Sequence, residues 1–168
     1  MQNLKELFNQ YKIKILGTMP YCVVEHVGAS SFPGVMTKGD LDVQIRVEVA
    51  DFEKAVKDCE SLFPRRHQEL WNDEFALFAD PAQEVKIDIM LTVKDSAYDS
   101  FYKIRDAMIK NPELQKKYMD FKNQYSDFLS DEYRKAKHIF FRQLEAELGL
   151  KVRPLDNFPK SKESSKIV

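Results

Sequence analysis

A glycine-rich loop that runs directly into an acidic strand is the feature that most constrains this sequence. Residues 27–45 hold three of the five glycines in the chain, at positions 28, 34 and 39. Glycine reaches positive φ readily and lets the backbone approach a ligand closely. Asp40 and Asp42 follow the loop two residues apart, so on a strand they point to the same face. Neighbouring carboxylates repel unless they share a proton or a cation, and a divalent cation is the usual solution for an exposed pair.

Composition sets limits on the classes of protein that come into question. The 168 residues include 43% hydrophobic and 32% charged residues, which is ordinary for one globular domain. Lysine and arginine total 26 against 27 acids, so no overall field attracts nucleic acid or anionic lipid. Two cysteines, Cys22 and Cys59, are too few for a disulfide framework or a zinc site. With no signal peptide pattern and no membrane-length apolar run, we expect a cytoplasmic protein.

Hydrophobic periodicity predicts an α+β fold, with a small mixed β-sheet core over about 1–94 and a helical part over about 95–149. We expect one domain over 1–150 and a loose tail over 151–168, where prolines, serines and lysines replace periodicity. The expected helices are 3–12 (ending near Gly17), 51–63, 96–110, 112–129 and 131–148, with Asp131 as a cap of the last, and the expected strands are 21–27, 40–49, 74–79 and 84–93.

A third acid joins the first two if the strands are neighbours. Turn residues at 80–83 predict that strands 74–79 and 84–93 form an antiparallel hairpin. Alternation along 84–93 places Asp88 opposite the aliphatic side, as it does Asp40 and Asp42 on their own strand. Three carboxylates then converge on one side of the sheet.

These residues carry a resemblance to a known family. The run E-H-V-G-A-S-S-F-P-G at 25–34, then Lys38 and D-L-D-V at 40–43, resembles the GrpB family, a branch of the nucleotidyltransferase superfamily. That superfamily joins a small-residue loop to an Asp-x-Asp strand and adds a third acid on a later strand. The resemblance covers about residues 20–148, most of the chain.

The resemblance implies a metal-dependent nucleotidyltransferase. Asp40, Asp42 and Asp88 would be the catalytic acids and hold Mg²⁺ (or Mn²⁺), which prefers oxygen ligands. The residues expected to bind the nucleoside triphosphate are Gly28, Ser30, Ser31, Lys38, Arg105, Lys122 and Lys137. The acceptor would be a small molecule, or a protein or nucleic-acid end, and no membrane is involved.

Two departures from the family pattern leave other functions open. Ala29 stands where a serine hydroxyl is usual, so Ser30 or Ser31 would have to replace it. Many relatives carry an apolar residue where Asp40 stands, so this chain resembles the three-acid pattern more closely than they do. The alternatives are a catalytically silent nucleotide-binding module and a protein-interaction module, in which the acids are a solvated strand end and the cations face solvent. On a purely structural interpretation, His26 supports the fold, and the aromatic residues at 118, 121, 125 and 128 belong to the hydrophobic core.

Overall fold

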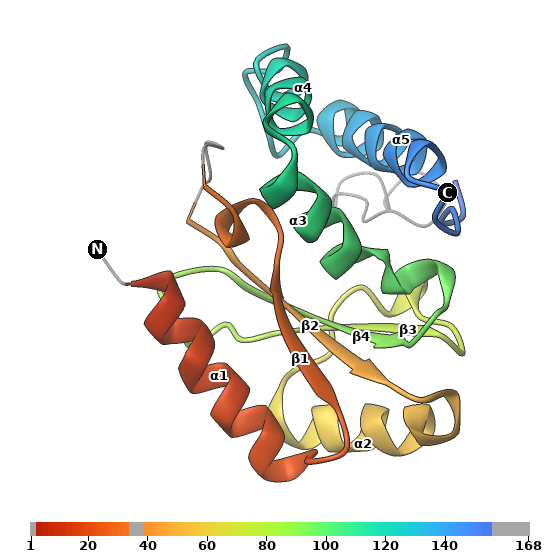
Figure 1. Cartoon of the computed structure of the whole chain (residues 1–168). Coiled ribbons are helices and arrows are strands. Elements are labelled where there is room, and N and C mark those ends of the chain that lie inside the picture. The colour runs from red at the N-terminus through yellow and green to blue at the C-terminus, as the bar shows by residue number, and fades with distance from the viewer. Residues whose placement is uncertain (1–2, 34–38, 156–168) are drawn as a thin grey trace, which may run out of the picture.

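The computed structural model describes residues 3–33 and 39–155, and within these ranges four strands form one mixed sheet (Figure 1). The strands are β1 (Val23–Val27), β2 (Leu41–Val47), β3 (Phe75–Ala79) and β4 (Ile87–Val93). Their order across the sheet is β1-β2-β4-β3; β2 and β4 run parallel, and the outer pairs are antiparallel. The predicted α+β class and the predicted hairpin are confirmed, and the two acidic strands, β2 and β4, are neighbours.

One face of the sheet carries the aliphatic side chains and is covered by two helices. Alternate residues of β2, from Leu41 to Val47, and of β4, from Ile87 to Val93, are buried there. Helices α1 (Leu4–Thr18) and α2 (Phe52–Leu62) pack on this face through Leu7, Ile15 and Ala55 among others. The Asn3 side chain caps α1 by accepting hydrogen bonds from the Lys5 and Glu6 amides. This face supplies most of the hydrophobic core.

The opposite face carries polar side chains that tie helix α3 (Ser100–Lys110) to the sheet. Arg46 donates to both oxygens of the fully buried Asp99, from Nε at 2.6 Å and Nη2 at 2.8 Å. The buried Gln44 amide donates to Thr92 Oγ1 and Asp99 Oδ1, and its oxygen accepts from the Tyr102 amide at 3.1 Å. Buried polar groups are tolerated when they are paired in this way.

Helices α4 (Pro112–Lys122) and α5 (Asp131–Glu147) follow α3, which lies between them and the sheet (Figure 1). Pro112 starts α4 with Asn111 as its cap. The predicted helix 112–129 was too long: it ends at Lys122 because Tyr125 and Phe128 turn back to pack on the Tyr133 ring, at 5.3 and 5.0 Å between centroids. The predicted capping role of Asp131 belongs to Ser130, whose hydroxyl accepts from the Tyr133 amide.

The first residues after α5 contact the rest of the chain. Arg153 donates from its backbone and its Nε to Glu145, which is fully buried. His138 Nε2 lies 2.8 Å from the Pro154 carbonyl, and Lys151 donates to the Asp95 carbonyl. Residues 156–168 of the predicted tail lie outside the described ranges. In the ranges that are described, no helix has both the length and the apolar character that crossing a membrane requires.

Candidate functional site

The glycine loop and two of the predicted acids meet at one end of the sheet. Asp42 and Asp88 are the second residues of β2 and β4, and they are direct partners in the parallel register. Val27, the last residue of β1, pairs with Asp42 from the other side. The loop that leaves β1 therefore starts beside the acid pair, as the sequence pattern required.

Gly28 brings the loop backbone against the Asp42 carboxylate. Its φ is +75°, and a Cβ added there would lie 2.1 Å from Asp42 Oδ2. A side chain is excluded on both grounds, because the left-handed conformation favours glycine and the space belongs to the carboxylate. After Gly28 the chain forms a short 3-10 turn over Ala29–Ser31, in which the Ser31 hydroxyl donates to the Gly28 carbonyl. Ser31 thus fixes the shape of the loop.

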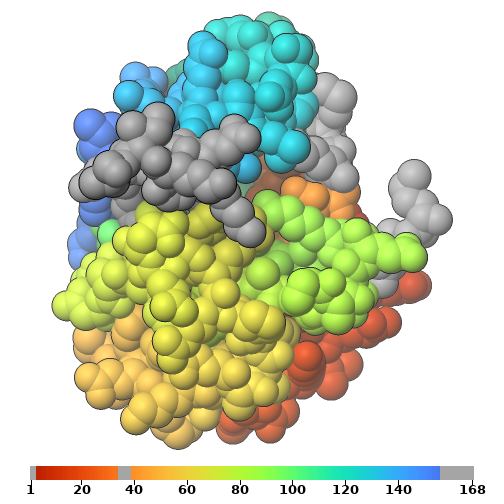
Figure 2. All heavy atoms as spheres, turned by 180° about the vertical axis from the view of Figure 1, so that it is seen from behind, coloured from red at the N-terminus to blue at the C-terminus, as the bar shows by residue number. Residues whose placement is uncertain are grey.

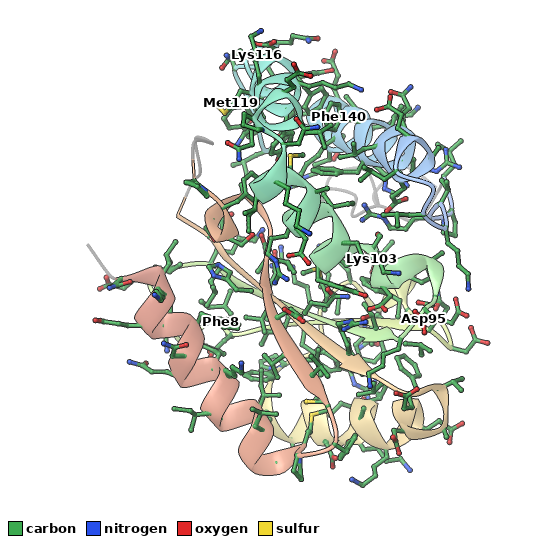
Figure 3. The ribbon with its side chains drawn as sticks, viewed as in Figure 1. Phe8, Asp95, Lys103, Lys116, Met119 and Phe140 are labelled. Carbon is green, nitrogen blue, oxygen red and sulfur yellow. The ribbon has the colours of Figure 1, made fainter. Side chains whose placement is uncertain are left out.

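Ser30 makes a contact that was not predicted from the sequence. Its Oγ lies 3.1 Å from Nε2 of His26, whose ring stacks on Phe8 with 5.1 Å between centroids. Phe8 projects from α1 toward β1 (Figure 3). Burial, with a smaller effect of the Arg105 charge, lowers the pKa of His26 and so favours the neutral imidazole. The spacing of four residues across a glycine was the available signal, since the chain reverses between the two side chains.

Asp42 is electrostatically unfavourable in its ionised form. Burial, followed by the neighbouring Asp88 charge, raises the pKa of Asp42 to about 6. Lys137 and Lys86 oppose this rise in the pKa, and Asp40 adds slightly to it. Lys137 comes from α5, so the charge of a residue in the helical half of the chain acts on the acid pair.

Tyr118 of α4 also lies within the field of the acid pair. Its pKa is raised, first by burial and then by the Asp42 charge. Tyr118 belongs to the aromatic cluster between α4 and α5, where its ring lies 5.6 Å from that of Phe140. The cluster is part of the hydrophobic core, as the structural interpretation of these aromatic residues predicted. It also places the ring of Tyr118 near the acids.

Asp88 is engaged by two cations from outside the predicted site. Arg66 pairs with Oδ1 through Nη1, and Lys86 Nζ lies 2.9 Å from Oδ2. Lys86 is two residues from Asp88, whereas Arg66 comes from the connection between α2 and β3. The sequence around Arg66 has no periodicity or motif that would have predicted this contact.

The remaining predicted cations have other surroundings. Arg105 Nη1 donates to Glu25 Oε2 at 2.8 Å and to the His26 carbonyl at 2.9 Å, and a further pair links it to Asp106. Arg105 therefore holds the end of β1, and contact with a triphosphate would require it to leave these partners. Lys122 is buried, with Nζ 5.6 Å from the Tyr118 ring centroid. Lys38 lies outside the described residues.

The carboxylates of Asp42 and Asp88 fit the ligand set that Mg²⁺ prefers among the divalent cations. Among the described residues, no three His, Cys, Asp or Glu side chains are grouped as metal ligands. Mg²⁺, however, is commonly held by one or two carboxylates together with substrate phosphates and water. The in-register pair Asp42 and Asp88 matches that donor set, with Asp40 next to it.

Comparisons with known proteins define the family. The sequence model of the GrpB protein family matches residues 2–147, and the chain therefore belongs to the GrpB family. A UPF0157 protein of Vibrio cholerae serotype O1 is 29% identical over 141 residues, which cover 83% of this chain and 74% of that protein. The conserved protein GrpB of Enterococcus faecalis, a crystal structure, shares the fold with a TM-score of 0.66 and 18% identity, over 88% of this chain and 93% of that chain.

Proposed function

We propose that this GrpB protein is a metal-dependent nucleotidyltransferase, which moves a nucleoside monophosphate from a nucleoside triphosphate to an acceptor hydroxyl. The observation that carries the proposal is the pairing of Asp42 with Asp88 directly beside the Gly28 loop. Two carboxylates held together at the edge of a glycine turn create a strong local preference for a cation. The loop backbone next to them offers N–H groups to an anion.

Each residue has a distinct part in this proposal. Asp42 and Asp88 would hold Mg²⁺ or Mn²⁺, with Asp40 adding negative charge beside them. When bound, the cation neutralises charge on the transferred phosphoryl group and the leaving pyrophosphate. The Gly28–Ser30 backbone would contact phosphate oxygens, with the Ser30 hydroxyl positioned by His26. Lys137 would contribute positive charge from α5.

A silent nucleotide-binding or protein-interaction module is the second candidate, and specific observations favour it. Arg66 and Lys86 already neutralise Asp88, and Ala29 lacks the hydroxyl that is usual in the loop. A module of this kind would keep the fold without transferring a nucleotide. Fold alone does not separate these functions, so chemistry must be measured.

The proposal is tested by pyrophosphate release from each α-³²P-labelled triphosphate with Mg²⁺ or Mn²⁺, with water, a panel of small hydroxyl compounds, the protein itself and an RNA as acceptors. We expect release, with label transferred to one acceptor class, to be abolished by Asp42→Asn. The matched control is Asp120→Asn, which changes an exposed carboxylate paired with Lys116 on α4. Metal-dependent nucleotide binding without release would support the silent nucleotide-binding module, and failure of every nucleotide and metal to bind would support the protein-interaction module.

A further inference from the structure

Arg66 is held in place by its backbone. Its amide donates to the Leu77 carbonyl at 2.9 Å, and its carbonyl accepts from the Trp71 indole at 3.0 Å. A bridge between Arg65 and Phe78 adds this segment to the edge of β3. Seen from behind, the segment (yellow) and the β3–β4 hairpin (yellow-green) form one continuous surface (Figure 2). The backbone contacts at the edge of β3 therefore position the Arg66 guanidinium to reach across β3 to Asp88 on β4.

Charges of both signs act at the acid pair. Arg66 and Lys86 pair with Asp88, and the charges of Asp88, Asp40, Lys86 and Lys137 act on Asp42. Asp40, Asp42 and Asp88 are called the acidic group below, and Arg66, Lys86 and Lys137 the basic group. A divalent cation that arrives alone meets three positive charges, and a triphosphate that arrives alone meets three negative ones. A metal–nucleotide complex, which carries both signs, complements both groups at once.

We infer that Arg66 and Lys86 are nucleotide-binding residues, which pair with Asp88 in the metal-free protein and turn to the phosphates of the nucleotide when a divalent cation takes Asp88. This inference rests on the proposed function and adds to it two residues that the acidic motif does not contain. Arg66 and Lys86 are 30% and 48% exposed in their side chains, so each has room to change its partner. A guanidinium suits phosphate because it donates two parallel hydrogen bonds.

A purely structural ion pair makes a different prediction. If Arg66 only secured the α2–β3 connection, its loss would disturb Asp88 and weaken metal binding and nucleotide binding alike. If Arg66 instead changes its partner, its loss should raise the affinity for the metal alone, because Arg66 competes with the metal for Asp88. The same loss should lower the affinity for the metal–nucleotide complex, because Arg66 contacts the phosphates. A rise in the affinity for the metal together with a fall in the affinity for the metal–nucleotide complex therefore separates the two roles.

The test is calorimetric titration of the full chain with Mn²⁺ alone, then with Mn²⁺ and each of ATP, CTP, GTP, UTP and tripolyphosphate. Arg66→Gln is expected to bind Mn²⁺ a few-fold more tightly, while its affinity for the Mn²⁺–nucleotide and Mn²⁺–tripolyphosphate complexes falls about tenfold, a typical effect of one charge-assisted contact. Arg65→Gln is the matched control from the same segment. Arg65 pairs with Glu60 at 2.6 Å and is expected to leave both affinities unchanged.

Lys86→Gln provides a second variant if Arg66→Gln does not fold, and the same opposite changes are expected. The inference is overturned if the variant lowers the affinity for Mn²⁺ alone, or if nucleotide binding equals that of the wild type. If the wild type and the variant bind nucleotides with Mn²⁺ equally well, this inference is wrong but the proposed function still stands. A wild-type protein that binds no nucleotide removes both.

Discussion

Gly28 joins two constraints at one residue, a backbone conformation that favours glycine and close contact with Asp42. Gly28→Ala should destabilise the fold through its positive φ and through collision with the Asp42 carboxylate. Gly149 has a similar φ of +69°, but no described atom outside its immediate neighbours lies within 4 Å of its ideal Cβ. Gly149→Ala should therefore lose only the conformational energy, about 1–2 kcal/mol. Gly28→Ala should lower the free energy of unfolding by at least about 1 kcal/mol more, because the added Cβ collides with Asp42 and because ψ of −178° at positive φ is almost exclusive to glycine.

Urea unfolding of the two alanine variants in EDTA measures this difference. Equal losses of unfolding free energy would mean that neither the backbone conformation of Gly28 nor its close approach to Asp42 adds a penalty beyond that of a positive φ.

Asp42 should be a residue whose replacement stabilises the metal-free protein. Its pKa is raised to about 6 in the folded state against about 3.9 in the unfolded chain, so the folded state holds the proton more tightly. Its contribution to stability is complete below about pH 4 and is lost as the pH rises through about 6. Asp42→Asn should thus gain about 2–3 kcal/mol over the wild type at pH 7.5, at roughly 1.4 kcal/mol for each pKa unit.

The measurement is unfolding of both proteins in EDTA between pH 4 and 7.5. The advantage of the variant should grow across this range. A variant that is less stable at pH 7.5 would show instead that the surrounding lysines fully compensate the ionised carboxylate.

At the scale of elements, Asp99 links α3 to the sheet and should dominate their attachment. Asp99→Asn leaves the Arg46 guanidinium without its carboxylate in a buried setting, and breaking such a pair destabilises by about 3–5 kcal/mol. Glu48→Gln removes a surface pair with Lys94, in which Glu48 is 62% exposed, and should change stability by less than about 1 kcal/mol. Comparable urea midpoints for the two variants would contradict the role assigned to Asp99.

The elements that could be predicted from sequence are those with a local pattern. The alternation in β2 and β4 follows from burial of one face, and the start of α4 follows from the chemistry of Asn111 and Pro112. The end of α4 could not be predicted, since Tyr125 and Phe128 keep helical spacing but are recruited by Tyr133 of the next helix. Tertiary packing decided that boundary.

The residues of the candidate site also divide into those that a local sequence pattern predicts and those that it does not. Asp42 and Asp88 were predictable because alternation assigns them to one face, and the structure then aligned them in register. The contact of Ser30 with His26 depends on a reversal of the chain, for which the spacing of four residues across a glycine is a weak signal. The contact of Asp88 with Arg66 depends on a connection without periodicity, which leaves no signal in the sequence. Arg105 and Lys122 were assigned to the nucleotide by family resemblance, and the structure places them in an ion-pair cluster and an aromatic cluster.

At the scale of the whole molecule, His138 couples the last helix to the chain that follows it. Burial lowers the pKa of His138, which contacts the Pro154 carbonyl, so the unfolded chain binds a proton more readily than the folded protein. The His138 contribution is complete above about pH 6.5 and is lost as the pH falls through the folded-state pKa. His138→Gln should make the free energy of unfolding fall less steeply between pH 7 and pH 5. A change in stability that is the same at every pH does not affect this prediction. Parallel pH profiles of unfolding would show that this histidine does not set the acid sensitivity.

The measurement that tests the account most directly is thermal unfolding of the wild-type chain with each of the four nucleoside triphosphates, in Mg²⁺ and in EDTA, beside the Asp40→Asn/Asp42→Asn double variant. A nucleotide at about a hundred times its Kd should add roughly 2.7 kcal/mol, or several degrees at roughly 2–4 °C per kcal/mol. We predict a shift that requires Mg²⁺ and is absent in the double variant. A wild-type protein that shows no shift with any nucleotide, or an equal shift in EDTA, would contradict the assignment of Asp42 and Asp88 to a metal–nucleotide site.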